Sequence, residues 1–532
     1  MTTATPSQPQ STCALLSVMA VSFGPLLFGI IIGSSGPTID TMKNQVIDFE
    51  GNFLKLDPAS DYVVFTEAQA SWYTSMVNIG AMLGAILGGW IVRAVGFRKS
   101  FGITVPMYIV SWLTLTFGSN VWLLFGTRMT AGIAMGVTSV ATPTYINEVS
   151  PTHLRGMLGT INQVSITVGI LLVYFLGMEL TISGGTKYSV LSESLGEAPA
   201  GSFCNWRAMA FVNLIPTLLL GLLLFFIPES PRWLASKGRE EEALAALNLL
   251  RGGFAEPEED TVMQDIVREC EISKTGPKDN QSSIWFEMWK ARKQVLIVIA
   301  VQIFQQFSGI NAIMFYCTSI MRNAKMKHPD GVSLSVMFEQ VIVTLLACFL
   351  IDLCGRRALL LTSAAVMAVS CLVFGLYFFL DEIGASGTTV LVFISVYTYM
   401  AAFSMGVGAI PWLIMGEVLP NNVRSIASSI AITFNWMCAF AVTENLGLAE
   451  KYLKLYGVMW AFAACCIGLV VFTAVFIPET KGKTFEEIQE YFDGHPVAPS
   501  PGSSSDLEMR KGKANNDEEI NTTVEAEPLL PK

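Results

Sequence analysis

Charged residues and histidines are scarce in this chain. Lys, Arg, Asp and Glu together make up 14% of the 532 residues, against about a quarter in an average soluble domain. The three histidines, His153, His328 and His495, stand too far apart to form a metal-ligand motif. The net charge of −10 also argues against a nucleic-acid partner. We therefore expect no metal, no cofactor and no enzymatic activity.

Long apolar runs take the place of the missing charge. Hydrophobic residues make up 52% of the chain, and charge-poor stretches long enough to cross about 30 Å of hydrocarbon recur throughout. The sequence predicts an all-α membrane protein with twelve membrane-spanning helices, six on each side of a polar stretch at 232–293. The expected ranges are 13–35, 70–92, 101–119, 121–146, 157–181, 208–227, 294–320, 335–353, 357–380, 388–416, 424–446 and 456–477.

Basic residues gather on one side of the predicted membrane. Arg93, Arg98 and Lys99 follow the second helix, Arg155 follows the fourth, and many more lie within 232–293. Because Lys and Arg concentrate in cytoplasmic loops, this side is predicted to be cytoplasmic, together with both termini. The stretch 232–293 also alternates charged and apolar residues at helical spacing, which suits short amphipathic helices on that face.

Three short motifs occur twice, each time about half the chain apart. They are Glu148–Arg155 with Glu417–Arg424 (Glu-Val-x-Pro-x-x-x-Arg), Gly96–Lys99 with Gly355–Ala358, and Pro228–Ser230 with Pro478–Thr480. So long a period indicates a duplicated half-protein, and duplicated apolar halves are typical of secondary transporters. The expected parts are a cytoplasmic N-terminus (1–12), a six-helix half (13–231), a helical linker (232–293), a second six-helix half (294–480) and a largely disordered cytoplasmic tail (481–532).

Acids and bases cluster where the repeated motifs end the helices. Such residues either form ion pairs that break and re-form between conformations, or are snorkelling charges that mark the membrane edge. The duplicated spacing favours the first interpretation. The predicted gating set is Arg98, Glu148, Arg155, Glu229, Arg232, Asp352, Arg356, Arg357, Glu417, Arg424 and Glu479. The first half has Val92 where an acid matching Asp352 would stand.

The ordered motifs resemble those of a known family. Pro228-Glu-Ser-Pro-Arg-Trp233, Gln305-Gln-Phe-Ser-Gly-Ile-Asn311 and Pro478-Glu-Thr-Lys-Gly-Lys483 are similar to motifs of the sugar porters of the major facilitator superfamily. The resemblance covers about 13–492. Gly24–Gly29 and Ile410–Glu417 are closer to the animal branch of intracellular-type facilitative glucose transporters and insect trehalose transporters. The resemblance to the sugar porters implies a sugar substrate, a bilayer environment and a monomer. It also implies that the linker forms a bundle of helices beneath the membrane spans.

Sugar chemistry explains the polar residues of the seventh predicted helix. A sugar offers hydroxyls that both donate and accept, and amides can answer both while aromatic rings cover the apolar face. Gln302, Gln305, Gln306 and Asn311 lie within ten residues of an otherwise apolar span. Such amides can also simply cross-link helices.

The resemblance assigns the predicted substrate site residue by residue. It implies hydroxyl contacts from three amides of the seventh helix and from an amide of the fifth, with two aromatic platforms. The site is Gln163, Gln305, Gln306, Asn311, Trp412, Asn435 and Trp436. Where many glucose facilitators have a further Asn, this chain has Ala439, which leaves the preferred sugar open. Pro411 and its neighbouring glycines serve either to bend the tenth helix or to allow close packing.

The first helix carries no acid for proton coupling. Proton-driven members of the resembled family have an Asp opposite an Arg of the fourth helix; here the Asp position is Ile31, although Arg128 remains. An intramembrane carboxylate beside a cation is the natural proton acceptor. We therefore expect facilitated diffusion of a hexose such as glucose. A proton-coupled carrier, a trehalose transporter and a non-transporting sugar sensor remain as alternatives.

The polar tail ends in a sorting-type motif. Glu525, four residues before Leu529-Leu530, resembles the dileucine signal that clathrin adaptors recognise. The alternatives are endosomal or lysosomal sorting and an inert tail at the plasma membrane.

Overall fold

The computed structural model describes residues 12–42, 46–47, 53–54, 65–150, 155–182, 205–251, 284–324, 328–384, 389–420, 423–483 and 485–493. The chain forms two compact units, Met1–Lys481 and Gly482–Lys532. The second contains one described helix, α23 (Phe485–Asp493), and the first contains all the others.

The first half of the larger unit is built from helices and one short strand pair. Its elements are α1 (Thr12–Val21), α2 (Phe23–Gly33), α3 (Ser35–Met42), β1 (Val46–Ile47), β2 (Phe53–Leu54), α4 (Glu67–Val95), α5 (Phe97–Phe117), α6 (Val121–Val149), α7 (Arg155–Ile182), α9 (Asn205–Val212) and α10 (Leu214–Leu223). The strands pair antiparallel over two residues each. The prediction of an all-α membrane fold is confirmed, with this small pair outside the helices.

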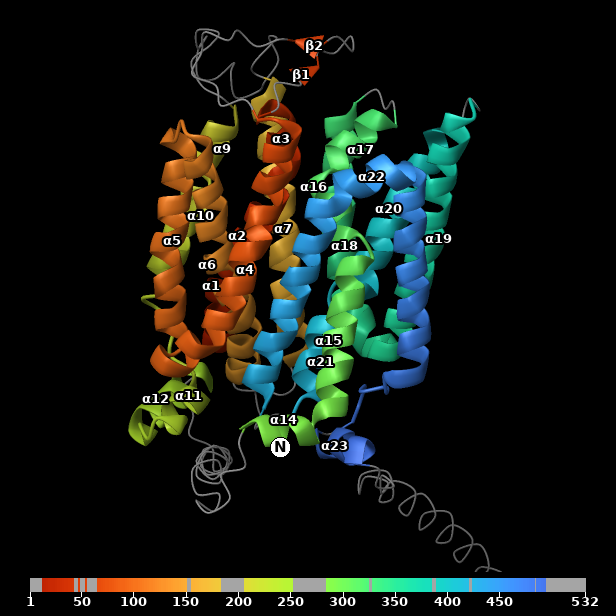
Figure 1. Ribbon diagram of the computed structural model, residues 1–532. Helices are drawn as coiled ribbons and strands as arrows, with labels where there is room; N and C mark the ends of the chain where they lie inside the picture. Colours follow the sequence, from red (N-terminus) through yellow and green to blue (C-terminus); the bar gives the residue numbers. More distant parts are fainter. Residues whose placement is uncertain are drawn as a thin grey trace, which may run out of the picture. The chain divides into compact units, whose positions relative to one another are not determined.

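The described parts of the linker and of the second half are built from helices. Their elements are α11 (Pro231–Ser236), α12 (Glu240–Arg251), α14 (Ile284–Lys290), α15 (Arg292–Phe307), α16 (Ile310–Phe315), α17 (Cys317–Asn323), α18 (Pro329–Cys354), α19 (Arg356–Glu382), α20 (Thr389–Ala402), the π-helix η2 (Phe403–Val407), α21 (Ile410–Val418) and α22 (Arg424–Phe476). The two halves stand side by side (Figure 1). We call the end of this unit that carries α11, α12 and α14 the linker face, and the other end the opposite face.

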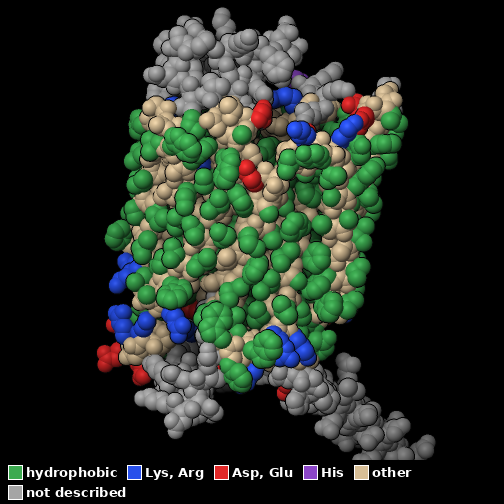
Figure 2. Space-filling model, in the orientation of Figure 1, with side chains coloured by type: hydrophobic (Ala, Val, Ile, Leu, Met, Phe, Trp, Pro, Cys, Tyr) green, Lys and Arg blue, Asp and Glu red, His purple; other side chains and the backbone are tan. Residues whose placement is uncertain are grey.

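Eleven helical segments of the described chain are long and apolar enough to cross a membrane. The last, Ile426–Phe476, is 51 residues long and contains a reversal at Lys454, whose backbone φ of 56° and ψ of 169° are not helical. It therefore contains both the eleventh and the twelfth predicted helix, and the twelve predicted ranges each have a counterpart. Apolar side chains cover the outside of the helices in a broad band, as a bilayer environment requires (Figure 2).

Four of the predicted helices are broken: the sixth consists of α9 and α10, and the breaks in the first, seventh and tenth position the site. The first consists of α1, α2 and α3, the seventh of α15, α16 and α17, and the tenth of α20, η2 and α21. Gly309 lies between α15 and α16 with φ of 94°, and a Cβ there would lie 2.4 Å from the Phe462 ring. Only glycine fits such a left-handed position without strain. The π-turn η2 confirms that the tenth helix is irregular, and Gly406 also packs against Ser363 of α19.

Candidate functional site

The amides of the seventh helix form a buried network with Asn435 of α22. Asn435 Nδ2 lies 2.7 Å from Gln302 Oε1 and 3.0 Å from Gln305 Oε1, and Gln306 Nε2 donates to Asn435 Oδ1 at 3.1 Å. Asn311 Nδ2 then donates to Gln306 Oε1 at 2.7 Å, across the break at Gly309. Four of the predicted site residues, Gln305, Gln306, Asn311 and Asn435, are thus brought together, and Gln302 joins them.

The same network reaches the irregular tenth helix. Gln305 Nε2 donates to the carbonyl oxygens of Val407 at 2.8 Å and Gly408 at 3.2 Å, at the end of η2. Since the π-turn leaves backbone carbonyls out of the regular helical ladder, a side-chain amide can reach them. The helix–helix cross-linking considered for these amides is therefore present in this conformation.

Two buried donors beside the network have no hydrogen-bond partner among the residues that the structure describes. They are Gln302 Nε2 and Trp436 Nε1, and their side chains are almost fully buried. Trp436 packs edge-on against Phe28 of α2 with ring centroids 5.5 Å apart, so it stands where the two halves meet. A buried donor without a partner costs about 1–3 kcal/mol, and a hydroxyl acceptor would relieve it.

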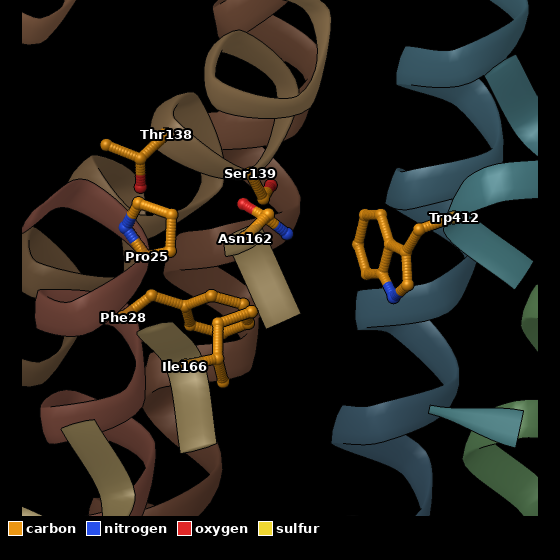
Figure 3. Close-up of a pocket in the computed structure, with 7 residues that line it drawn as sticks. All are labelled: Pro25, Phe28, Thr138, Ser139, Asn162, Ile166 and Trp412. Carbon is orange, nitrogen blue, oxygen red and sulfur yellow. The ribbon is translucent and has the colours of Figure 1, made fainter. Parts of the chain in front are cut away.

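A pocket opens between the halves beside Trp412. It is lined by Pro25, Phe28, Thr138, Ser139, Asn162 and Ile166 of the first half and Trp412 of the second. Figure 3 shows the Trp412 ring facing Asn162 and Phe28 across the gap. Hydroxyl, amide and aromatic groups in one cleft suit a ligand with polar edges and apolar faces.

The predicted Gln163 lies one residue from this lining. Its side chain is buried, with 9% exposed, while Asn162 faces the pocket. Neighbouring residues on a helix point about 100° apart, so only one of the two amides can face a given direction. Asn162, Thr138 and Ser139 are absent from the predicted site, and single polar residues in an apolar span carry no signal of their direction.

Near the opposite face, hydrogen bonds between hydroxyl, amide and carboxylate groups hold the two halves together. Glu444 Oε2 of α22 accepts from Ser75 Oγ of α4 at 2.5 Å and from Ser71 Oγ at 3.2 Å. One turn deeper, Asn78 Nδ2 donates to Thr443 Oγ1 at 3.0 Å. We call these five residues the Glu444 clamp. The sequence does not single them out as partners, because the two sides of the clamp are more than 360 residues apart.

A second link crosses the halves on the same side. Tyr174 OH of α7 donates to the carbonyl oxygen of Met314 in α16 at 2.6 Å, and Thr74 Oγ1 lies 3.2 Å from Tyr316 OH. The pocket at Trp412 is nearer the linker face, where α7 begins and α21 ends. The halves are closed beyond the amide network on the opposite face.

The duplicated motifs form matching structures at the linker face. In the first half, Glu229 Oε1 and Oε2 accept from the backbone N–H of Phe97 at 2.8 Å and Arg98 at 3.1 Å. In the second, Glu479 accepts from the N–H of Arg356 at 2.9 Å and Arg357 at 3.1 Å. Each acid thus caps the helix that follows a left-handed glycine, Gly96 or Gly355. An acid at a helix N-terminus also gains from the helix dipole.

The arginines of the predicted gating set reach backbone carbonyls as well as acids. Arg98 donates to Phe225, Arg357 to Ala474 and Arg424 to Leu419. Arg356 forms an ion pair with Glu417, with Nη2 3.2 Å from Oε1. Arg232 is exposed at the start of α11. The side chains of Arg155 and Asp352, and the whole of Glu525, Leu529 and Leu530, lie outside the described residues.

A second acid completes each half of this arrangement. Glu148 accepts from Ser230 Oγ in the first half, and Glu417 accepts from Thr480 Oγ1 at 2.6 Å in the second. One difference between the halves concerns this second acid: Arg356, which pairs with Glu417, corresponds to Phe97 in the first half. The second half therefore carries an ion pair on a position that is apolar in the first.

The two capping acids have opposite pKa shifts. Burial raises the pKa of Glu229, although three backbone N–H donors oppose the shift. Partial burial acts in the same direction on Glu479, but donors from Lys481, Arg356, Arg357 and Thr480 outweigh it and lower its pKa. The first-half cap therefore takes up a proton at a higher pH than the second-half cap.

Arg128 is buried in the first half without a carboxylate among the described side chains that contact it. Its Nη1 donates to the Ile31 carbonyl oxygen at 3.0 Å and to Ser34 Oγ at 2.9 Å, and Nη2 donates to Ser35 Oγ at 3.1 Å. Its guanidinium lies 4.3 Å from the centroid of the Tyr73 ring. Neutral oxygens at the break between α2 and α3, together with a π face, surround the charge.

Comparison with known proteins places these features in a family. The family model described as "Sugar (and other) transporter" matches residues 16–492. The chain is 32% identical to the bovine facilitated glucose transporter member 8 of solute carrier family 2, over 92% of this chain and 96% of that protein. It is 31% identical to the facilitated trehalose transporter Tret1 of Polypedilum vanderplanki, over 90% of this chain and 88% of that protein.

Solved structures agree with this placement. A structure of the proton:xylose symporter XylE bound to 6-bromo-6-deoxy-D-glucose superposes with a TM-score of 0.73 at 26% identity, covering 90% of this chain and 99% of XylE. A partially occluded inward-open structure of XylE from E. coli gives 0.69 at 25% identity, covering 89% and 100%. With its twelve predicted spans, its duplicated halves and its amide-lined interior, the chain belongs to the sugar porters of the major facilitator superfamily.

Proposed function

We propose that this sugar transporter is a uniporter that moves a hexose such as glucose down its gradient by alternating access. The observation that carries the proposal is the amide network around Asn435. Beside it lie Gln302 Nε2 and Trp436 Nε1, two donors without a partner in the described part of the chain. Amides that now bond one another can exchange those bonds for sugar hydroxyls at little net cost, because each can donate and accept.

Each predicted site residue takes a role in this proposal. Gln305, Gln306, Asn311 and Asn435 bind sugar hydroxyls, and Trp412 and Trp436 cover apolar ring faces. Asn162 and Gln163 supply the first-half amides. The ring of Trp412 faces Asn162 across the pocket, so a sugar there would touch both halves (Figure 3). A ligand that touches both halves is the one whose binding can favour their closure around it.

The surroundings of Arg128 favour uniport over proton coupling. A proton-driven carrier needs an acid whose charge changes during the cycle, and Ile31 stands at that position. Neutral groups from Ser34, Ser35 and Tyr73 hold the cation instead. The names of the bovine and insect relatives, both called facilitated, point the same way, whereas XylE is a proton symporter.

We place the linker face in the cytoplasm, because the basic residues of the sequence concentrate there. The closed Glu444 clamp then corresponds to an inward-facing state. The charged set at the linker face acts as the gate whose contacts form and break during the cycle. The Arg356–Glu417 pair, which lies within the second half, is formed in this state. The dileucine tail directs the protein to endosomal or lysosomal membranes, and Leu529→Ala with Leu530→Ala should move it to the surface; unchanged localisation would contradict that role.

Counterflow in liposomes tests the transport proposal. Vesicles preloaded with unlabelled sugar should take up labelled glucose without a pH gradient and without a sugar-induced current. A proton-linked current would support a symporter, and saturable binding without flux would support a sensor. Running trehalose in parallel separates a hexose carrier from a disaccharide carrier, a choice that Ala439, in place of a further Asn, leaves open.

A further inference from the structure

The short helix α14 exposes a cluster of aromatic side chains at the linker face. Trp285 is 67% exposed, Phe286 51% and Trp289 65%. Trp285 and Trp289 are four residues apart, so they lie on the same side of the helix. Three exposed aromatic rings in seven residues make an apolar surface that a water-facing helix would avoid.

Connectivity holds this cluster at the edge of the membrane. Only Ala291 separates α14 from α15, and the membrane span begins at Arg292. Leu296, one turn further along α15, is 63% exposed and belongs to the apolar outer surface. Figure 2 shows hydrophobic side chains together with Lys and Arg at the lower edge of the apolar band, where Figure 1 places α14.

Basic groups accompany the aromatic rings. Lys290 Nζ lies 4.9 Å from the Phe286 ring centroid, and the Arg292 guanidinium lies 5.2 Å from that of Trp289. Lys290 also pairs with Glu287 at 3.2 Å, which leaves the positive charges of Arg292 and Lys293 in excess. Both are exposed. Amphipathic rings beneath basic groups are the combination that suits a bilayer interface with anionic headgroups.

We propose that α14 is a membrane-surface anchor, with Trp285, Phe286 and Trp289 inserted among the acyl chains and Arg292 and Lys293 bound to the headgroups of anionic phospholipids. The partner is the leaflet at the linker face. Because α15 carries Gln302, Gln305 and Gln306, this anchor fixes the end of the helix that bears the substrate site.

Quenching of tryptophan fluorescence by brominated lipids tests the anchor. The full chain would be reconstituted into two sets of vesicles, both made of phosphatidylcholine and phosphatidylserine in the same proportions. Brominated acyl chains, at equal mole fraction, are carried by phosphatidylcholine in one set and by phosphatidylserine in the other. We expect stronger quenching by the brominated phosphatidylserine. Trp285→Phe with Trp289→Phe should remove that difference, whereas Trp122→Phe, which changes an exposed tryptophan of α6, should preserve it.

The basic residues are tested in the same vesicles. Arg292→Gln with Lys293→Gln should lower the relative affinity for phosphatidylserine by about fivefold for each charge removed. The matched control, Lys237→Gln with Arg239→Gln, removes two exposed charges from the same face and should leave the affinity unchanged. Equal quenching by both lipids in the unmodified protein would overturn headgroup binding. Quenching that is the same with and without Trp285 and Trp289 would place α14 in water or against another protein, and would overturn the anchor itself.

Discussion

At the scale of single residues, Asn435 is the centre of the candidate site. It links three glutamines of one helical segment through the nitrogen and the oxygen of its amide, and each hydrogen bond contributes about 1 kcal/mol. Its position on α22 lets it hold the seventh helix on one side while Trp436 meets the first half on the other. A residue in this place influences both sugar affinity and the packing of the second half.

Asn435→Ala should therefore reduce transport efficiency by about tenfold or more, since it removes hydroxyl partners and leaves Gln302 and Gln306 unsatisfied. The matched control is Asn445→Ala on the same helix, where the exposed amide donates to the Ala441 carbonyl oxygen of its own turn. Counterflow rates at several sugar concentrations measure both. Equal rates for the two variants would remove Asn435 from the site.

The capping acids provide a prediction that depends on pH. Glu479 has a lowered pKa, so its stabilisation is present above the unfolded-state pKa and is lost as the pH falls through the folded-state value. Glu229 has a raised pKa, so ionisation at neutral pH works against the folded state. At pH 7, Glu479→Gln should lower the melting temperature more than Glu229→Gln.

The gap between these two variants should shrink as the pH falls below the lowered pKa of Glu479, because the native carboxylate is then protonated as well. Loss of the charged acceptor at neutral pH corresponds to about 1.5–3 kcal/mol. Thermal unfolding of the purified proteins from about pH 2 to about pH 8, a range that extends well below the ordinary carboxylate pKa of about 4.3, provides the measurement. A gap that is constant over this range would contradict the assignment.

At the scale of elements, the helix breaks position the amides. Gly309 separates α15 from α16, and Asn311 can turn back to Gln306 only because the chain departs from the helix between them. Gly309→Ala would place a methyl group in a left-handed position and 2.4 Å from Phe462. The expected loss is at least about 1–2 kcal/mol in the free energy of unfolding, together with loss of counterflow.

Gly447→Ala is the matched control for this substitution. Gly447 lies within α22, and no atom would lie within 4 Å of a Cβ added there. Alanine at this position should be neutral or stabilise by up to about 1 kcal/mol, because it favours the helix. Thermal unfolding compares the two; a Gly309→Ala protein as stable and active as Gly447→Ala would show that the break tolerates a side chain.

The elements differ in how far the sequence determines them. The membrane spans follow from apolar length alone, so all twelve predicted ranges agree with helices. The directions of side chains within them do not follow from length: the family resemblance predicts a sugar contact from Gln163, and the sequence gives no signal that its neighbour Asn162 lines the pocket. The sequence also predicts Glu229 and Glu479 as charged gate residues, and their backbone N–H partners depend on turns at Gly96 and Gly355 that the charges alone do not reveal.

At the scale of the whole molecule, the Glu444 clamp is the closure that a change of access must open. Charge-assisted hydrogen bonds from Ser71 and Ser75 hold α22 of one half against α4 of the other. The sequence does not predict the clamp, because its partners come together only when the halves pack. Its acid stands at the end of a span, where the sequence offers no reason to prefer pairing over contact with water.

Ser71→Ala with Ser75→Ala should shift the population toward opening at the opposite face by about tenfold, since two charge-assisted hydrogen bonds are lost. Electron-spin distances between labels at positions 122 and 452, in a background without reactive cysteines, would report a longer separation. The control is Ser335→Ala, whose hydroxyl bonds Tyr397 within one half. Unchanged distances in the double variant would show that the clamp does not hold the closed state.

The reversal at Lys454 has a mechanical consequence. Because the eleventh and twelfth helices join through one non-helical residue, their connection has no slack to take up a relative displacement. When the turns bearing Glu444 leave α4, the descending arm of α22 must travel with them or pivot about Lys454. That arm packs on α19, which begins at the Arg356 cap. A displacement of α22 at one side of the membrane is therefore transmitted to α19 and to the other side.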